Sequence, residues 1–129
     1  MPQDELYRDV ILDHYEQPYH RGSCPLATHG YEDANPLCGD RIRIEIRVSP
    51  TECADCIFFD GQGCCISQAA ASMLVSQMEG KKLTELRNFS AGDMLELFGA
   101  TLTPARKRCC LLPWRVLQRA IAHPLDKPQ

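Results

Sequence analysis

The stretch RIRIEIRV at residues 41–48 alternates charged and β-branched side chains without a break. Successive residues of a β-strand point to opposite faces, so this pattern predicts a strand with one buried face and one solvated face. Turn-forming residues follow at 49–52, and the isoleucine and two phenylalanines within residues 55–60 suit a hairpin partner. Residues 28–36 are expected to form an irregular strand at the edge of the same sheet.

Apolar residues at helical spacing predict helices around this sheet. The expected segments are residues 4–15, an alanine-rich segment between Gly63 and Gly80, residues 81–88, residues 91–99, and a last helix that ends near residue 122. We expect the last helix to begin between Cys109 and Pro113, because proline is tolerated in a first turn and costly later. The sum is an α+β fold, a small three-stranded antiparallel sheet packed against helices, in a single domain of residues 1–129.

Composition narrows the class of protein. The chain has 129 residues, of which 44% are hydrophobic and 24% charged, and its formal charge is −3. A net negative charge does not favour nucleic acid as the main partner. The first residues resemble no signal peptide, and no window approaches the 18 or so apolar residues that a membrane span needs. We therefore expect a soluble cytoplasmic protein that does not enter membranes.

Cysteine is abundant in this chain, with residues at positions 24, 38, 53, 56, 64, 65, 109 and 110. In a reducing compartment, clustered thiols more often bind metals or carry sulfur than form disulfides. The simpler alternative is that a free cysteine packs as a small apolar residue, and it has to be weighed at each position.

Three of these cysteines and one carboxylate share a structural context. Cys38 and Asp40 precede the regular strand, Cys64 lies where the alanine-rich helix starts, and Cys109 lies where the last helix is expected to start. Helix amino termini favour a thiolate, and Gly39 lets the loop turn so that Cys38 and Asp40 can face one point. Such a set suits a zinc ion, or an incomplete cage for iron and sulfide.

Three motifs then point to a family. NPLCGD at 35–40, GQGCCISQAAASML at 61–74 and RKRCCLLPW at 106–114 resemble the three cysteine motifs of the U-type iron-sulfur assembly scaffolds. This family includes IscU, SufU and the amino-terminal part of NifU. The opening ELYRDVILDHYEQPYHRG is similar to the SufU branch, and the resemblance extends over about residues 5–122.

The resemblance implies a fold of the SufE/NifU type and a metal or cluster site formed by Cys38, Asp40, Cys64 and Cys109. It implies Cys64 rather than Cys65, and Cys109 rather than Cys110, from the residues that flank each one. It also implies a cysteine desulfurase as sulfur donor, with Cys38 and Cys109 as the candidate sulfur acceptors. A downstream iron-sulfur carrier or an apo-protein would receive the product.

Two departures from the family pattern keep alternatives open. Arg108 precedes Cys109 where IscU proteins carry a histidine and SufU proteins usually a lysine, and arginine does not ligate metal, although it can stabilise a thiolate. Only 44 residues separate Cys64 from Cys109, so the SufU insertion is missing. The hypotheses are a scaffold that builds a transient [2Fe-2S] cluster, a zinc-dependent sulfur transfer protein that holds Zn²⁺, and a structural zinc domain. The first two describe a scaffold or sulfur carrier rather than a conventional enzyme.

The remaining candidates receive simpler interpretations. Cys53 and Cys56 have C-x-x-C spacing, but residues three apart on a strand face opposite ways, so we do not expect a shared metal. Cys65 and Cys110 are expected to pack in the core. His14 is expected to be a hydrogen-bonded core residue. The other expectations are a loop or surface position for His20, and no identifiable partner for Cys24.

Overall fold

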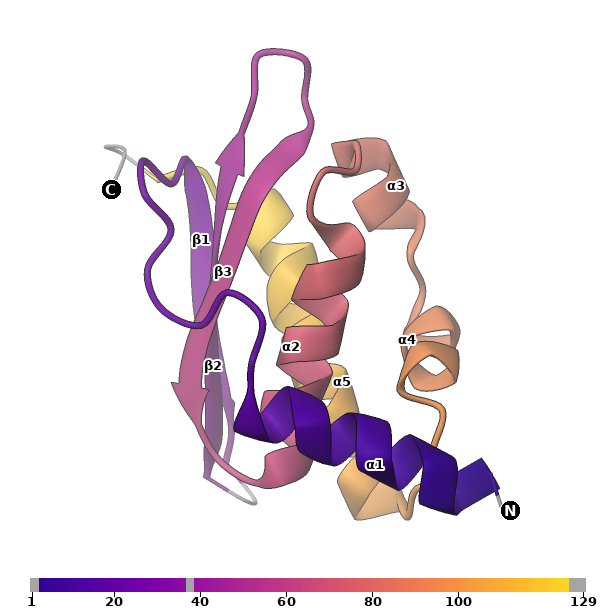
Figure 1. Ribbon diagram of the computed structural model, residues 1–129. Helices are drawn as coiled ribbons and strands as arrows, with labels where there is room; N and C mark the ends of the chain where they lie inside the picture. Colours follow the sequence, from indigo (N-terminus) through magenta and orange to yellow (C-terminus); the bar gives the residue numbers. More distant parts are fainter. Residues whose placement is uncertain (1–2, 37–38, 126–129) are drawn as a thin grey trace.

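The computed structural model describes residues 3–36 and 39–125. The strands are β1 (His29–Asn35), β2 (Asp40–Val48) and β3 (Ala54–Gln62), and they form one antiparallel sheet in the order β1-β2-β3. The helices are α1 (Gln3–Glu16), α2 (Cys65–Met78), α3 (Leu83–Asn88), α4 (Ala91–Phe98) and α5 (Pro104–Ile121). The α+β fold with a three-stranded antiparallel sheet, as predicted, is confirmed (Figure 1).

The alternating strand is the centre of the sheet. Ile42, Ile44 and Ile46 of β2 are fully buried, and each buried isoleucine stabilises the fold by about 1.5–3 kcal/mol. Glu45 belongs to the opposite face and is nevertheless buried, because the loop between α1 and β1 covers it there. The backbone N–H of Cys24 in this loop donates to Glu45 Oε1 over 2.9 Å.

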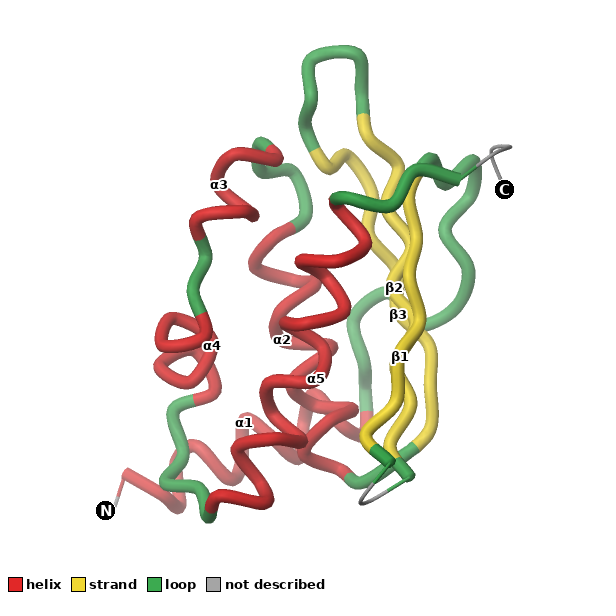
Figure 2. The backbone as a smooth tube through the Cα atoms, turned by 180° about the vertical axis from the view of Figure 1, so that it is seen from behind, coloured by secondary structure: helices red, strands yellow, loops and turns green. Residues whose placement is uncertain are grey.

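Helices α2 and α5 lie side by side against one face of the sheet (Figures 1 and 2). Three consecutive alanines, Ala69, Ala70 and Ala71, are fully buried in α2 and allow close packing against its neighbours. Helix α1 crosses the outer side of α2, where His14 and Ser72 share a hydrogen bond of 2.7 Å between Nδ1 and Oγ. His14 is thus hydrogen-bonded, as predicted, but it is half-buried rather than a core residue.

The predicted start of the last helix is wrong. Helix α5 begins at Pro104, with Thr103 as its N-cap accepting a hydrogen bond from the backbone N–H of Arg106. Pro104 therefore takes the early position expected of Pro113, and Pro113 lies inside the helix. As a result, Cys109 lies in the second turn of α5 rather than at its start.

The segment with α3 and α4 is held against α5 by two side chains. Trp114 Nε1 donates to the carbonyl of Phe89 over 2.7 Å, and Gln118 Nε2 donates to the carbonyl of Leu86 over 2.7 Å. These bonds satisfy carbonyl groups at the end of a short helix, where intrahelical partners run out.

Within the described ranges, no helix combines the length and apolar character needed to cross a membrane.

Candidate metal and sulfur site

Three side chains from different elements converge where β2 begins. Asp40 is the first residue of β2, Cys64 is the N-cap of α2, and Cys109 lies in α5. One ligand atom from each residue lies within 4.8 Å of the other two. Figure 1 shows the starts of β2, α2 and α5 at the same end of the molecule. Cys38, the fourth predicted residue, lies outside the described residues.

Asp40 and Cys64 are joined by two hydrogen bonds. The backbone N–H of Cys64 donates to Asp40 Oδ1 over 2.9 Å, and the Cys64 thiol donates to Oδ2 over 3.3 Å. The carboxylate is only 1% exposed. A buried carboxylate needs such donors, because desolvation without them is costly. A cation shared by Asp40 and Cys64 would take the place of this thiol proton between Sγ and Oδ2.

Gly63 makes this approach of β2 to α2 possible. Its φ is +148°, and a Cβ atom placed there would lie 2.3 Å from Asp40 Oδ1. No side chain fits within that distance, so the residue before Cys64 has to be glycine for Asp40 to lie where it does. Gly39, with φ +74°, provides the left-handed turn that the loop into β2 requires.

The thiols of this cluster differ in access. Cys64 is exposed, whereas Cys109 is only 7% exposed. A hollow opens over them, lined by Asn35, Cys64, Cys65, Ile66, Ala105, Arg106, Arg108 and Cys109. The two exposed arginines in this lining favour anionic species, such as thiolates, in the hollow.

The donor set fits a metal with an affinity for sulfur. In a tetrahedral zinc site, bonds of about 2.0–2.3 Å place ligand atoms roughly 3.3–3.8 Å apart. The three groups within 4.8 Å are therefore close to that separation before any metal draws them together. Sulfur and carboxylate oxygen are both ligands that zinc and iron accept. Groups that could hold a metal ion are present in this chain.

The sequence matches the family model for the NifU-like N terminal domain over residues 6–129. The chain belongs to the NifU-like N-terminal domain family. The family indicated by the three cysteine motifs is therefore confirmed.

Several known proteins are similar to this NifU-like domain. The zinc-dependent sulfurtransferase SufU of Bacillus subtilis is 33% identical, and the alignment covers 92% of this chain and 91% of the relative. The iron-sulfur cluster assembly scaffold protein IscU of Thermotoga maritima is 31% identical, with 90% and 92% covered. The crystal structure of a putative iron-sulfur cluster assembly scaffold protein for the SUF system from Fervidobacterium islandicum superposes with a TM-score of 0.73 at 23% identity, covering 93% and 99%.

Neighbouring cysteines of the NifU-like domain separate as helix geometry requires. Cys110 is fully buried, and burial raises the pKa of its thiol to about 12, so it packs in the core as predicted. The same prediction is wrong for Cys65, which is exposed and lines the hollow over the site. Cys65 is the first residue of α2 and lies at the rim of the hollow rather than beneath the helix.

A second cluster was missed by sequence reasoning. His20, Cys56 and Glu79 place one ligand atom each within 4.8 Å of one another, and all three are half-buried. His20 was expected at a loop or surface position, and Cys56 was not expected to share a metal with Cys53. No spacing rule links residues so far apart in sequence, so only the fold reveals the group. Cys53 lies just before β3, with its thiol directed to the carbonyl of Thr51, and is not a member of this group.

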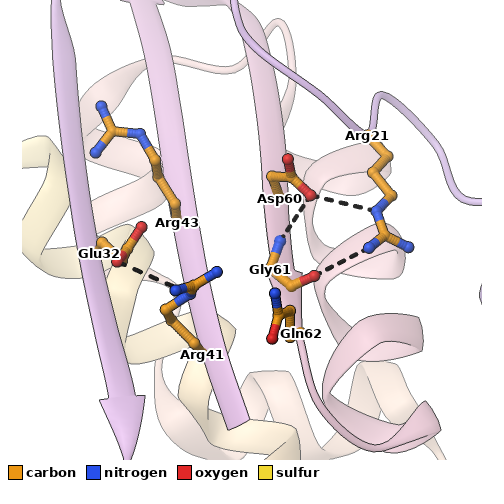
Figure 3. A pocket seen from close by; sticks show the side chains of 7 residues that line it. All are labelled: Arg21, Glu32, Arg41, Arg43, Asp60, Gly61 and Gln62. Carbon is orange, nitrogen blue, oxygen red and sulfur yellow. Dashed lines mark hydrogen bonds and ion pairs between the residues drawn. The ribbon is translucent and has the colours of Figure 1, made fainter.

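A further hollow lies on the face of the sheet away from the helices (Figure 3). Its charged side chains are largely paired with each other. Arg21 Nε lies 3.4 Å from Asp60 Oδ1, and Arg41 Nε lies 3.9 Å from Glu32 Oε2. These pairs are exposed, and exposed ion pairs contribute about 0–1 kcal/mol each. Their charges largely cancel, so we assign no ligand to this hollow.

Proposed function

We propose that this protein accepts sulfur from a cysteine desulfurase and builds or relays a labile iron-sulfur cluster on Cys38, Asp40, Cys64 and Cys109. The observation that carries the proposal is the convergence of Asp40, Cys64 and Cys109 from three elements within 4.8 Å. Membership in the NifU-like N-terminal domain family supports it, as do relatives named for scaffold and sulfurtransferase activity.

The first step is transfer of one sulfur atom. A thiolate of this protein attacks the outer sulfur of the persulfide on the desulfurase. The new S–S bond forms as the old one breaks, and the desulfurase cysteine leaves as a thiolate, so no net oxidation occurs. We assign the acceptor role to Cys38, because Cys109 is only 7% exposed and a buried thiol is poorly placed for attack.

Cluster assembly follows when iron binds. Each sulfane sulfur takes up two electrons from an external thiol or one-electron reductant to become sulfide. Three thiolates and the Asp40 carboxylate would then hold two iron and two sulfide ions as cargo. A carboxylate binds iron less tightly than a fourth thiolate would, which suits a cluster that has to leave for a carrier or an apo-protein.

A second candidate function is zinc-dependent sulfur transfer. The observation that favours it is Arg108, which lines the hollow. Arginine does not ligate metal, so the chain lacks the histidine that IscU proteins carry at this position. The 33% identical relative is named a zinc-dependent sulfurtransferase. Zn²⁺ would hold the same four groups, and Cys38 would leave the ion to accept sulfur. In either function the 129 residues act as one domain in the cytoplasm, where a reducing environment keeps the thiols free.

One reconstitution separates these candidates. The protein is incubated with a cysteine desulfurase, cysteine, ferrous iron and dithiothreitol under anaerobic conditions. Visible absorption of a [2Fe-2S] chromophore that is lost in Cys64→Ser supports the scaffold. Faster desulfurase turnover that needs zinc and is lost in Cys38→Ala supports sulfur transfer. If neither response appears, the proposed function is wrong and a structural zinc site remains.

A further inference from the structure

The second cluster combines three unlike ligands. His20 comes from the loop after α1, Cys56 from β3 and Glu79 from the C-cap of α2. Their ligand atoms lie within 4.8 Å of one another, which includes His20 Nδ1 at 2.7 Å from Glu79 Oε2. Nitrogen, sulfur and oxygen donors are the three kinds that Zn²⁺ accepts, and three protein ligands leave a fourth position open to solvent.

This cluster is separate from the Asp40 site. Cys64 caps the amino-terminal end of α2, and Glu79 caps its other end. At 1.5 Å per residue, the two positions are roughly 22 Å apart along the helix axis. A metal at one site therefore shares no ligand with the other, and each can be removed by its own substitutions.

His20 is held in place at a backbone cost. Its φ of +48° is uncommon for a residue other than glycine, although histidine is found there more often than most. The imidazole ring is stacked between Tyr19 and Phe58, with centroid distances of 4.0 Å and 4.5 Å. Two stacked rings fix the plane of the imidazole and direct Nδ1 to Glu79. Such pre-orientation is what a metal ligand needs.

The carboxylate of Glu79 faces several hydrogen-bond donors. The Tyr19 hydroxyl donates to its Oε1 atom. The Glu79 side chain is 16% exposed, so the charge is shielded but reachable. Oε2 accepts both the Ile57 N–H, over 2.9 Å, and the His20 ring. A cation that replaced this hydrogen bond would lie between His20 Nδ1 and Glu79 Oε2.

The neighbouring thiol completes the surroundings without joining the ligands. Cys24 is 1% exposed, and its thiol donates to the carbonyl of Cys56 over 3.7 Å. Cys24 is not one of the three described residues whose ligand atoms lie within 4.8 Å of one another, so Cys56 supplies the sulfur of this cluster.

We infer that His20, Cys56 and Glu79 form a second divalent metal site, selective for zinc-like ions that accept sulfur, nitrogen and oxygen donors. Binding replaces the hydrogen bond between His20 and Glu79 by two metal bonds and releases the proton of the Cys56 thiol. The proposal uses no residue of the Asp40 site, so it stands or falls independently of the proposed function.

The test uses the full chain with Cys38→Ser, Cys64→Ser and Cys109→Ser, which removes all three thiols of the Asp40 site. Cobalt(II) is the probe, because thiolate-bound cobalt gives charge-transfer and d–d absorption. We expect one equivalent to bind with both signatures, and Zn²⁺ to displace it. Adding Cys56→Ser should abolish the charge-transfer band and weaken binding by more than about 10-fold. Adding Cys53→Ser, the matched control from the same C-x-x-C pair, should change neither.

Three results would overturn the second site. These are absence of thiolate-bound cobalt in the triple variant, retention of the band after Cys56→Ser, and equal loss after Cys53→Ser. Circular dichroism checks folding of each variant. If Cys56→Ser does not fold, His20→Asn answers the same question, since asparagine tolerates the left-handed backbone. Unchanged cobalt affinity in folded His20→Asn would equally refute the assignment.

Discussion

The Sγ atom of Cys64 lies 3.3 Å from Oδ2 of Asp40, although 24 positions separate the two residues in sequence. The first residue of β2 and the N-cap of α2 are thus in contact before any metal binds. The thiol proton and the backbone N–H of Cys64 both point to the carboxylate. Removing that proton leaves a thiolate and a carboxylate side by side, an arrangement that a cation stabilises.

Asp40→Ala should slow release of a reconstituted cluster several-fold. The carboxylate is the weakest of the four proposed ligands, and in excess thiol the vacated position is filled by a sulfur donor that binds iron more tightly. Cluster transfer to an apo-ferredoxin, followed by circular dichroism in the visible range, measures the rate. Asp60→Ala is the control, because Asp60 is an exposed carboxylate on β3. Faster loss from Asp40→Ala would contradict the weak-ligand argument.

Gly63→Ala should damage both stability and metal binding. The added Cβ would meet Asp40 Oδ1 at 2.3 Å, so the strand or the helix has to shift, at a cost of about 1–3 kcal/mol beyond backbone strain. Gly80→Ala is the matched control, because φ there is +89° and no atom lies within 4 Å of the added Cβ. It should cost about 1–2 kcal/mol and leave metal affinity unchanged. Chemical denaturation and metal titration measure the two effects. Equal metal affinity in both variants would show that Gly63 does not position Asp40.

Thiol alkylation should sort the cysteines by environment. Burial raises the pKa of Cys24 and Cys110 to about 12, so their reactive thiolate fraction is negligible at about pH 8. Cys64 and Cys65 are exposed and should react first in the metal-free protein. Peptide mass spectrometry after brief iodoacetamide treatment gives the order, and unfolding in guanidinium should make all eight cysteines react. Early labelling of Cys110 in the folded protein would contradict its core position.

The sequence predicted most of the fold for clear physical reasons. Residues 41–48 alternate strictly, which predicts a strand with one buried face, and their hairpin partner at 55–60 followed from turn chemistry. The predicted start of α5 was wrong because Pro113 was assigned to the first turn of the helix, which Pro104 occupies. Both Pro104 and Pro113 occur within ten residues, and the Thr103 cap decides between them. Cap geometry depends on backbone conformation, which spacing does not reveal.

The site was predicted only in part. Motif order indicated Asp40, Cys64 and Cys109, whereas the burial of Cys109 and the exposure of Cys65 depend on how α5 and α2 pack. The cluster of His20, Cys56 and Glu79 was beyond sequence reasoning, because a loop, a strand and a helix end meet there. Helical periodicity placed His14 on the face of α1 that hydrogen-bonds to α2, although the residue is half-buried rather than in the core.

Acid should destabilise the protein partly through Glu79. Its pKa is lower in the folded protein than the ordinary value of 4.5, so its contribution to stability is present above pH 4.5 and is lost as pH falls through the folded pKa. Glu79→Gln should lower the free energy of unfolding at neutral pH by about 1–3 kcal/mol. The loss should shrink below pH 4.5. Thermal melting in the presence of a chelator, over a pH series, measures it. A loss independent of pH would show that the Glu79 charge contributes nothing.

The most direct test of the account is the coordination of zinc in the Cys56→Ser variant, in which the second cluster is disabled. X-ray absorption at the zinc edge reports ligand types and bond lengths. We expect three sulfur neighbours at about 2.3 Å and one oxygen neighbour at about 2.0 Å, as Cys38, Asp40, Cys64 and Cys109 require. Loss of one sulfur neighbour in Cys64→Ser would support the assignment. A first shell of nitrogen and oxygen alone, or one unchanged by Cys64→Ser, would contradict it.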